Sequence, residues 1–318
     1  MTVLEAIQKS AEFLAKKGVD SPRLQTELLL AHLLKLPRMK LYLNFERVLT
    51  PAETDALREL VKRRGQREPL QHITGSTSFC GFEIAVNRCA LVPRPETELL
   101  AESGWQFLST LNSLARRSEA ETAQPPTALD FGTGTGCIAI ALAAKCPSAK
   151  IIATDVSADA LALAGENAAR NNVADRIEFL QGDGFAAFLP EGRVTRAPNS
   201  EIETKIGGSC NSPLRRMEFD LIISNPPYIP SAEIATLQPE VRDFDPRGAL
   251  DGGADGLDFY RKLAAEAQPF LKPTGKIMLE FGDGQADAVR TIFDAEKWIV
   301  EAVKEDYSHQ QRILVARS

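Results

Sequence analysis

No apolar segment of this 318-residue sequence approaches the ~20 residues that a membrane-spanning helix requires. The first ten residues, MTVLEAIQKS, also lack the apolar core of a secretory signal peptide. With 44% hydrophobic and 25% charged residues, the composition is ordinary for a globular protein with one large and one smaller domain. We therefore expect a cytoplasmic protein.

Cysteine and histidine are scarce and scattered. The five cysteines show no C-x-x-C spacing, and the three histidines, His32, His72 and His309, are far apart in the sequence. This pattern indicates neither a metal centre nor a Cys–His nucleophile. We expect no bound metal, and free thiols as a reducing cytosol maintains them.

Charge is low overall and unevenly distributed. The net charge of −6 argues against a non-specific nucleic-acid binder. Residues 1–75 carry 13 Lys and Arg against 9 Asp and Glu, whereas the remaining residues carry 24 against 34. A mildly basic amino-terminal segment suits an acidic partner, but a solvated helical face explains it more simply.

Residues 1–75 show the periodicity of short amphipathic helices, which predicts a small helical bundle. One apolar stripe consists of Leu4, Ile7, Ala11 and Leu14. Ser21 and Pro22 predict the N-cap and first position of a second helix. Thr50 and Glu53 predict a capping box at the start of a later helix.

Residues 76–93, STSFCGFEIAVNRCALVP, change in character. Aromatic and β-branched residues gather around Gly81, which predicts a β-hairpin linking two domains. The larger domain then extends over residues 94–318 and begins with a helix in PRPETELLAESGWQFL.

Short apolar runs alternate with helical segments from about Thr127 onward. The runs are TALDFG, AKIIATD, RIEFLQGD, FDLIISN and GKIMLEFG. Strands alternating with helices predict an α/β fold with a mostly parallel sheet. Two polar stretches, residues 112–126 and 190–217, interrupt the pattern and are expected to be surface insertions.

A glycine-rich loop follows the first of these strands and opens a helix. It consists of Gly132, Thr133, Gly134, Thr135 and Gly136. Its glycines allow a tight turn and a close approach to a ligand. A P-loop would end in Gly-Lys-Ser/Thr, and a dinucleotide-binding loop would place its third glycine one residue later. Neither alternative fits.

Two acidic residues follow later strands of the same domain. Asp155 ends the second strand, where a carboxylate accepts hydrogen bonds from ribose hydroxyls. Asp183 follows the third strand, where it can accept from an adenine amino group. Each aspartate alone is better explained as a helix cap or turn residue. Together with the glycine loop, they indicate a site for S-adenosylmethionine.

The sequence SNPPYIP follows the apolar run FDLIIS. Proline cannot continue a central strand, because it has no backbone N–H. Each X–Pro bond also favours extended geometry in the preceding residue, which holds Asn225 and Pro226 in place. The result is a fixed pair of acceptors, the side-chain oxygen of Asn225 and the carbonyl oxygen of Pro226.

Two fixed acceptors suit a planar –NH₂ group, whose delocalised lone pair makes it a poor nucleophile. Accepting both N–H groups orients the nitrogen and favours the positive charge that develops on it during methyl transfer. Tyr228 can stack on the flat group. A simple turn is the competing interpretation of this segment. The preceding glycine loop and acids favour a catalytic one.

Four motifs together resemble the HemK/PrmC family over nearly the whole chain. They are GTGTG, NPPY, PRPETE (residues 93–98) and RGALDGGADGLDFYR (residues 247–261). The resemblance implies a Rossmann-like methyltransferase domain with a seven-stranded sheet, preceded by a helical domain and a hairpin linker. It implies methylation of N5 of the Gly-Gly-Gln glutamine of peptide chain release factors, in translation termination.

The resemblance also implies roles for individual residues. Residues 132–136 and Asp155 match the cofactor loop and the ribose carboxylate, and Asn225 also lies beside the cofactor. Asn225, Pro226, Pro227 and Tyr228 match the clamp for the substrate amide. Asp183 and Gly184 match the adenine-side segment, although many relatives carry a bulky residue in place of Gly184. His72 stands where relatives often have tyrosine.

Two other functions remain open on the sequence alone. NPPY is shared with DNA and RNA amino-methyltransferases. If this chain had that function, we would expect a basic groove or a target-recognition insertion for the nucleic acid. A non-catalytic adenosyl-binding module would leave the NPPY geometry unused. We favour a monomeric protein-glutamine methyltransferase that uses S-adenosylmethionine, docks release factors through residues 1–75 and binds no nucleic acid directly.

Overall fold

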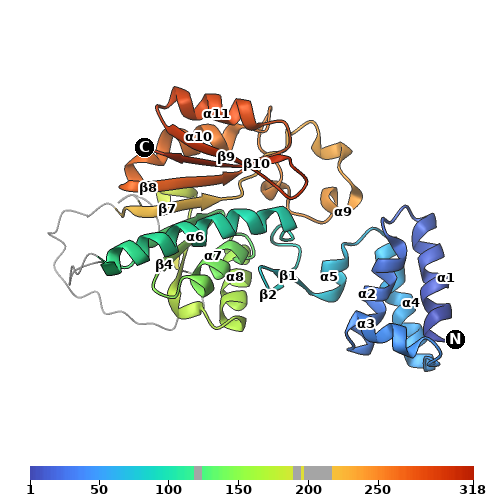
Figure 1. The fold of residues 1–318 in the computed structure, drawn as a ribbon. Helices are drawn as coiled ribbons and strands as arrows, with labels where there is room; N and C mark the ends of the chain where they lie inside the picture. The colour runs from blue at the N-terminus through green and yellow to red at the C-terminus, as the bar shows by residue number, and fades with distance from the viewer. Residues whose placement is uncertain (118–123, 189–194, 197–216) are drawn as a thin grey trace. The chain divides into compact units, whose positions relative to one another are not determined.

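The computed structural model describes residues 1–117, 124–188, 195–196 and 217–318 (Figure 1). Two compact units divide the chain. The helical unit comprises Met1–Thr77, Val86–Arg88 and Thr236–Asp245, and the sheet unit comprises Ser78–Ala85, Cys89–Ala235 and Pro246–Ser318. Among the described residues, no helix is long and apolar enough to cross a membrane. The same residues contain no disulfide and no cluster of three or more potential metal ligands.

The helical unit is built from short helices around an apolar core. Its helices are α1 (Val3–Lys16), α2 (Pro22–Leu34), α3 (Arg38–Leu41), α4 (Pro51–Gly65), α5 (Leu70–Thr74) and α9 (Pro239–Arg242). The core centres on fully buried side chains such as Ile7, Leu14, Leu29, Leu30 and Leu41. Amphipathic helices too short to be stable alone gain their stability from this shared core.

The N-terminal caps of two helices in this unit agree only partly with those predicted from the sequence. The capping box of Thr50 and Glu53 is confirmed, with both reciprocal hydrogen bonds present. Ser21 precedes α2 as predicted, but its side chain makes no capping hydrogen bond. Its backbone is left-handed (φ 47°), which turns the hydroxyl away from the N–H groups of the first turn.

The buried face of α1 is also rotated relative to the predicted stripe. Val3, Ala6, Ile7 and Leu14 are buried, whereas Leu4 and Ala11 are only partly covered. The prediction gave the helix and its period correctly. Which side of α1 is buried depends on how α2 and α4 pack against it, and the periodicity of the sequence does not reveal that packing.

A segment distant in sequence completes the helical unit. Glu240 of α9 accepts one hydrogen bond from Arg64 and one from Arg67, each at 2.6 Å. Arg64 is only 3% exposed, so its charge depends on this partner. A chain lacking residues 1–75 would leave Glu240 without both cations.

The hairpin predicted around Gly81 is confirmed as β1 (Ser76–Phe79) and β2 (Phe82–Ala85). Its two turn residues, Cys80 and Gly81, both have positive φ, as a tight two-residue turn requires. In the sheet unit, the buried Asn167 bonds both backbone groups of Ala85 and donates to the Thr135 carbonyl. One amide thus ties the hairpin to the glycine loop.

The sheet unit has an α/β fold in which one mixed sheet runs in the order β6-β5-β4-β3-β7-β8-β10-β9. The strands are β3 (Thr127–Phe131), β4 (Lys150–Asp155), β5 (Ile177–Gln181), β6 (Thr195–Arg196), β7 (Phe219–Ser224), β8 (Leu271–Glu280), β9 (Ile299–Glu305) and β10 (Gln311–Arg317). Neighbouring strands from β5 to β8 are parallel, and β6, β9 and β10 pair antiparallel. The predicted Rossmann-like fold with seven strands is confirmed, and two-residue β6 adds an eighth at the edge.

Helices cover both faces of this sheet (Figure 1). Figure 1 shows α6 (Pro95–Arg117), α7 (Cys137–Lys145) and α8 (Ala158–Arg170) on one side, and α10 (Asp258–Glu266) and α11 (Ala286–Ala295) on the other. Helix α6 extends to Arg117, into the stretch 112–126 that was predicted as a polar insertion. Residues 118–123, and residues 190–217 except for 195–196 and 217, lie outside the described residues.

The centre of the sheet fixes where a ligand can bind. Strand β7 is buried at every position and β3 at all but its first, as expected for strands covered on both faces. Strand β3 leads to β4 on one side, while β7 lies on its other side. A parallel sheet whose strand order reverses in this way opens a crevice at the carboxyl ends of those strands.

Candidate active site

A cavity of about 400 Å³ lies at the carboxyl ends of β3, β4 and β7, entirely within the sheet unit. This volume lies in the range of about 300–1,000 Å³ typical of small-molecule sites. Predicted residues that line it are Gly132, Thr133, Gly134, Thr135, Asp155, Asp183, Gly184, Asn225, Pro226 and Pro227. Gly136 and Tyr228, which were also predicted for the site, are not among its described lining residues.

The glycine loop follows β3 through three left-handed positions, Gly132 (φ 73°), Gly134 (φ 55°) and Gly136 (φ 81°). No atom lies within 4 Å of where a Cβ at Gly132 would stand, so its bare backbone leaves room at the cavity wall. A Cβ at Gly136 would instead lie 2.9 Å from the Cβ of Ala164 in α8. Gly136 therefore serves helix packing, while Gly132 faces open space.

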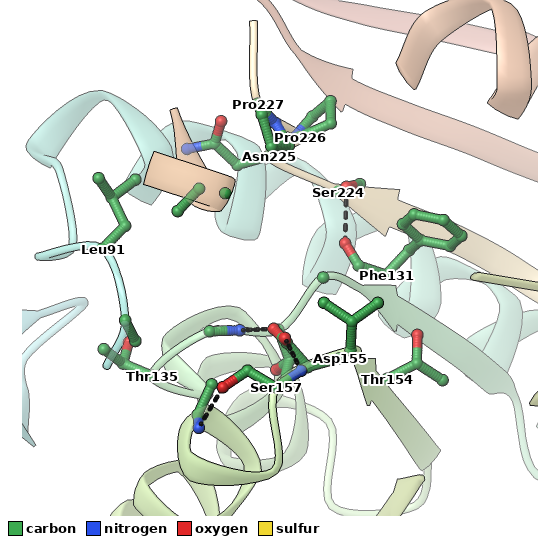
Figure 2. Close-up of a pocket in the computed structure, with 18 of the residues that line it drawn as sticks. Leu91, Phe131, Thr135, Thr154, Asp155, Ser157, Ser224, Asn225, Pro226 and Pro227 are labelled. Carbon is green, nitrogen blue, oxygen red and sulfur yellow. Dashed lines mark hydrogen bonds between the residues drawn. The ribbon is translucent and has the colours of Figure 1, made fainter. Parts of the chain in front are cut away.

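Asp155 ends β4, as the sequence predicts, and holds the loop in shape. Its Oδ2 accepts from the Gly134 N–H and its Oδ1 from the Ser157 N–H, both at 2.9 Å (Figure 2). Each carboxylate oxygen has two acceptor sites, so Asp155 retains capacity for a ligand. Figure 2 shows Asp155 and Ser157 on one wall of the cavity, with Asn225 and the two prolines across from them.

Asp130 is a second acid at the end of a central strand, and sequence reasoning gave it no role. It is 1% exposed. Its Oδ2 accepts from the Thr133 hydroxyl at 2.6 Å and from the Ala139 N–H at 3.1 Å. Its Oδ1 has no hydrogen-bond partner among the described residues. Burial raises the pKa of Asp130 from 3.8 to about 7.

This raised pKa predicts that stability falls as pH rises from about 5 to about 7. In that window Asp130 is ionised in the unfolded chain and still protonated in the folded protein. The unfolded chain thus binds fewer protons, and the free energy of unfolding decreases by at most about 1.4 kcal/mol per pH unit for this group. Glu280, whose pKa burial raises from 4.5 to about 7, acts in the same direction.

Urea denaturation of wild type and Asp130→Asn at several pH values measures this slope. We expect the variant to lose part of the decrease and the exposed-acid control Asp159→Asn to retain it. A variant with the wild-type slope would show that Asp130 is ionised in the folded protein across this range.

Asp183 and Gly184 lie at the cavity edge after β5. Asp183 is largely exposed, and its Oδ1 pairs with Lys262 Nζ at 2.5 Å. At Gly184 (φ 62°) a Cβ would stand 2.8 Å from the Phe131 ring. The ring fills the space that a side chain at 184 would need, which explains the glycine at this position.

Asn225 leaves the end of β7 and enters the cavity wall (Figure 2). The preceding Ser224 is buried and donates to the Phe131 carbonyl at 2.6 Å, which anchors the strand end. The Asn225 Nδ2 donates to the Thr97 hydroxyl oxygen at 3.0 Å. With its nitrogen so engaged, the amide leaves Oδ1 available, and Pro226 and Pro227 continue the same wall.

The motif RGALDGGADGLDFYR (residues 247–261) forms backbone hydrogen bonds with the residue that follows NPPY. The Ile229 N–H donates to the Leu250 carbonyl, and the Gly252 N–H donates back to the Ile229 carbonyl, at 3.0 and 2.9 Å. A Cβ at Gly252 would lie 2.9 Å from the carbonyl oxygen of Pro227. Glycine is required there because the two backbones touch.

Tyr228 is turned toward the core of the sheet unit. Its side chain packs against the buried cluster that includes Tyr260 and Phe281, and burial raises the pKa of its hydroxyl. Its carbonyl accepts from Gln285 Nε2 at 2.9 Å. The role foreseen for Tyr228, stacking on a flat substrate group, stays a prediction.

Three residues of the site escaped the sequence analysis: Asp130, Thr97 and Glu280. Two of them carried a usable signal, since Asp130 and Glu280 are lone acids at the ends of otherwise apolar runs, as Asp155 is. Thr97 sits within PRPETE, but nothing in that motif shows that it bonds a residue 128 positions away.

The chain is similar to known proteins in both of its parts. A family profile described as the PrmC N-terminal domain matches residues 5–75, and one described as the methyltransferase small domain matches residues 114–192. A solved protein-(glutamine-N5) methyltransferase (release factor-specific) from Alicyclobacillus acidocaldarius is 25% identical, with a TM-score of 0.37 over 71% of this chain and 94% of that one.

Two curated relatives align along nearly the whole sequence. The release factor glutamine methyltransferase of Geobacter sulfurreducens is 40% identical over 92% of this chain and 88% of that protein. Its namesake from Chlorobaculum tepidum is 39% identical over 98% of this chain and 95% of that protein. Identity at this level and coverage confirms the resemblance seen in the sequence: the chain belongs to the family of release factor glutamine methyltransferases.

Proposed function

We propose that this chain transfers a methyl group from S-adenosylmethionine to N5 of the glutamine in the Gly-Gly-Gln motif of peptide chain release factors. The observation that carries the proposal is the pair of acceptors at Asn225 and Pro226. They line the same cavity as the glycine loop and Asp155. The proposed cofactor site and the proposed amide clamp therefore lie in one cavity, as methyl transfer from the cofactor to an amide requires.

The cavity fits S-adenosylmethionine. Asp155 has acceptor capacity for ribose hydroxyls, and the open position at Gly132 lets a ligand approach the loop backbone. Asp183 also lines the cavity, which supports the proposal that it meets the adenine side. When bound, S-adenosylmethionine supplies an electrophilic methyl group on a sulfonium centre.

The chain's own residues supply orientation and electrostatics. An amide nitrogen is a weak nucleophile, because its lone pair is shared with the carbonyl. Asn225 Oδ1 and the Pro226 carbonyl accept its two N–H bonds, which fixes the plane of the amide and stabilises positive charge on nitrogen. The N–H proton becomes acidic as the new N–C bond forms, and it leaves to water.

Mass spectrometry of release factor incubated with this protein and labelled S-adenosylmethionine tests the proposal. We expect one added methyl group on the Gly-Gly-Gln glutamine and none on a release factor in which that glutamine is replaced by alanine. Label found in DNA or RNA, with release factor unmodified, would support the amino-methyltransferase alternative instead.

We further propose that the helical unit docks the release factor. A side-chain amide is common to every exposed glutamine, so selectivity requires contacts remote from the chemistry. Two apolar side chains are exposed together in this unit, Met39 at 67% and Leu43 at 83%. Arg38 and Lys40 adjoin them, and this mixture suits a protein surface carrying acidic groups.

Charge placed on this surface is expected to weaken docking. The double variant Met39→Glu, Leu43→Glu should reduce kcat/KM for release factor by about 10-fold, while kcat at saturating release factor stays within about 2-fold. Tyr307→Glu is the matched control, because Tyr307 is 82% exposed in the sheet unit. Unchanged kcat/KM in the double variant would exclude this surface from docking. Point variants are preferable to truncation at residue 75, which would strip Glu240 of its cations.

Three further properties of this chain are its cellular location, its oligomeric state and its contact with nucleic acid. We propose that it acts in the cytoplasm, as a monomer and without direct contact with nucleic acid. The excess of acidic residues after residue 75, 34 against 24 basic ones, supports the last point.

A further inference from the structure

An asparagine side chain can present either end to a substrate, and only one end serves the proposed reaction. The amide oxygen accepts hydrogen bonds and the –NH₂ group donates them. If the Asn225 amide were turned over, its N–H groups would meet the N–H groups of the substrate glutamine. Something must therefore hold the oxygen toward the substrate.

Thr97, near the start of α6, holds the other end. Its hydroxyl oxygen accepts from Asn225 Nδ2 at 3.0 Å, and its side chain is only 3% exposed. A hydroxyl can also donate one hydrogen bond, so Thr97 alone does not fix the direction: it could equally donate to an Asn225 oxygen. The direction is set by where the Thr97 proton goes.

Glu280 settles that direction. It ends β8, next to the end of β7, because Ser224 pairs with Leu279 in the parallel register. Glu280 is 3% exposed, and interaction with the Thr97 side chain lowers the pKa of its carboxyl group against the effect of burial. Its Oε2 has no hydrogen-bond partner among the described residues, so the carboxyl group has capacity to accept the Thr97 proton. Burial raises the pKa of Glu280 to about 7, so the carboxyl is ionised above that pH. An ionised carboxylate accepts and never donates, so it takes the Thr97 proton and leaves a Thr97 lone pair for Asn225 Nδ2.

We propose that Thr97 and Glu280 are positioning residues, which orient the Asn225 amide so that its oxygen faces the substrate glutamine. The three groups form one directed chain from Asn225 N–H to the Thr97 hydroxyl and on to the Glu280 carboxylate. All three belong to the sheet unit: Asn225 directly follows β7, Thr97 lies in α6, and Glu280 ends β8. The inference rests on the proposed function, since orientation matters only if Oδ1 accepts from the substrate.

Kinetics of two matched variants test the first link. Thr97→Val keeps the shape of the side chain and removes the hydroxyl, whereas Thr97→Ser keeps the hydroxyl. We expect Thr97→Val to lower kcat by about 10-fold, the equivalent of one lost hydrogen bond, with cofactor affinity within about 2-fold. Thr97→Ser should stay within about 3-fold of wild type. Equal kcat in Thr97→Val and wild type would overturn the proposal, as would equal losses in both variants.

The second link is tested by Glu280→Gln at pH 8. Glutamine keeps the size of the side chain but can donate to Thr97, so the direction is no longer imposed. We expect kcat to fall several-fold while the urea midpoint stays at or above that of wild type, since a buried charge has been removed. A wild-type kcat in this variant would remove Glu280 from the chain.

A readout independent of activity separates this inference from the proposed function. The ¹⁵N–¹H signals of the Asn225 side chain are assigned by their loss in Asn225→Ala. In wild type, the proton bonded to Thr97 should exchange slowly with water, and exchange should be at least about 10-fold faster in Thr97→Val. If wild type fails to methylate release factor, the proposed function falls and slow exchange still supports the orientation. Fast exchange in wild type would refute the orientation whatever the activity.

Discussion

Asn225→Ala is expected to lower kcat by about 10²-fold or more, the cost typical of removing a group that stabilises charge in the transition state. Alanine removes the side-chain acceptor and leaves the Pro226 carbonyl alone to orient the substrate amide. Cofactor affinity should stay within a few-fold, because the loop and Asp155 lie on the opposite wall (Figure 2). Single-turnover kinetics and calorimetry measure the two quantities separately.

Asn171→Ala is a suitable control for Asn225→Ala. Asn171 closes α8 and donates to two backbone carbonyls, so its loss also removes asparagine hydrogen bonds from the sheet unit. It does not line the cavity, and turnover should be unaffected. Near-normal turnover in Asn225→Ala would remove the amide clamp from the mechanism.

Much of the site was predictable, because parallel strands bring their carboxyl ends together. The glycine loop, Asp155, Asp183 and Asn225 each follow an apolar run, and the structure places all of them around one cavity. That inference needs only strand positions and direction. Rigid X–Pro geometry then places the Asn225 and Pro226 acceptors without knowledge of any tertiary contact.

What escaped prediction depends on contacts between segments distant in sequence. The bond from Asn225 to Thr97 spans 128 positions, and the ion pair from Arg64 to Glu240 spans 176. Strands β9 (IVEAVKE) and β10 (QRILVAR) were not among the predicted runs. Strand β9 lies at the sheet edge and mixes apolar with charged residues, whereas the apolar stretch ILVA of β10 was overlooked. Edge strands lack the continuous apolar signal of buried ones.

Gly136 and Tyr228 show a different limit of motif reasoning. Each belongs to a motif whose other members line the cavity, but neither is among the described lining residues. Gly136 allows α7 and α8 to approach, and Tyr228 packs on the core of the sheet unit. A motif thus combines residues that line the cavity with residues that pack elsewhere, and the motif alone does not tell them apart.

The second large effect is expected at the cofactor wall. Asp155→Ala should weaken S-adenosylmethionine binding by about 1.5–3 kcal/mol, the range for hydrogen bonds to a charged group, or roughly 10- to 150-fold in Kd. Two causes act together. The ribose loses its acceptor, and the N–H groups of Gly134 and Ser157 lose the carboxylate that shapes the loop.

Asp155→Asn separates these two causes. Its amide keeps one oxygen but places an –NH₂ group against the N–H of Gly134 or Ser157, so the loop is disturbed although an acceptor remains. We therefore expect Asp155→Asn to lose much of the affinity too, and the exposed-acid control Asp159→Ala to lose none. Isothermal titration of the full-length protein decides the matter. If Asp155→Ala binds as wild type does, the ribose lies elsewhere in the cavity, and the carboxylate serves the loop alone.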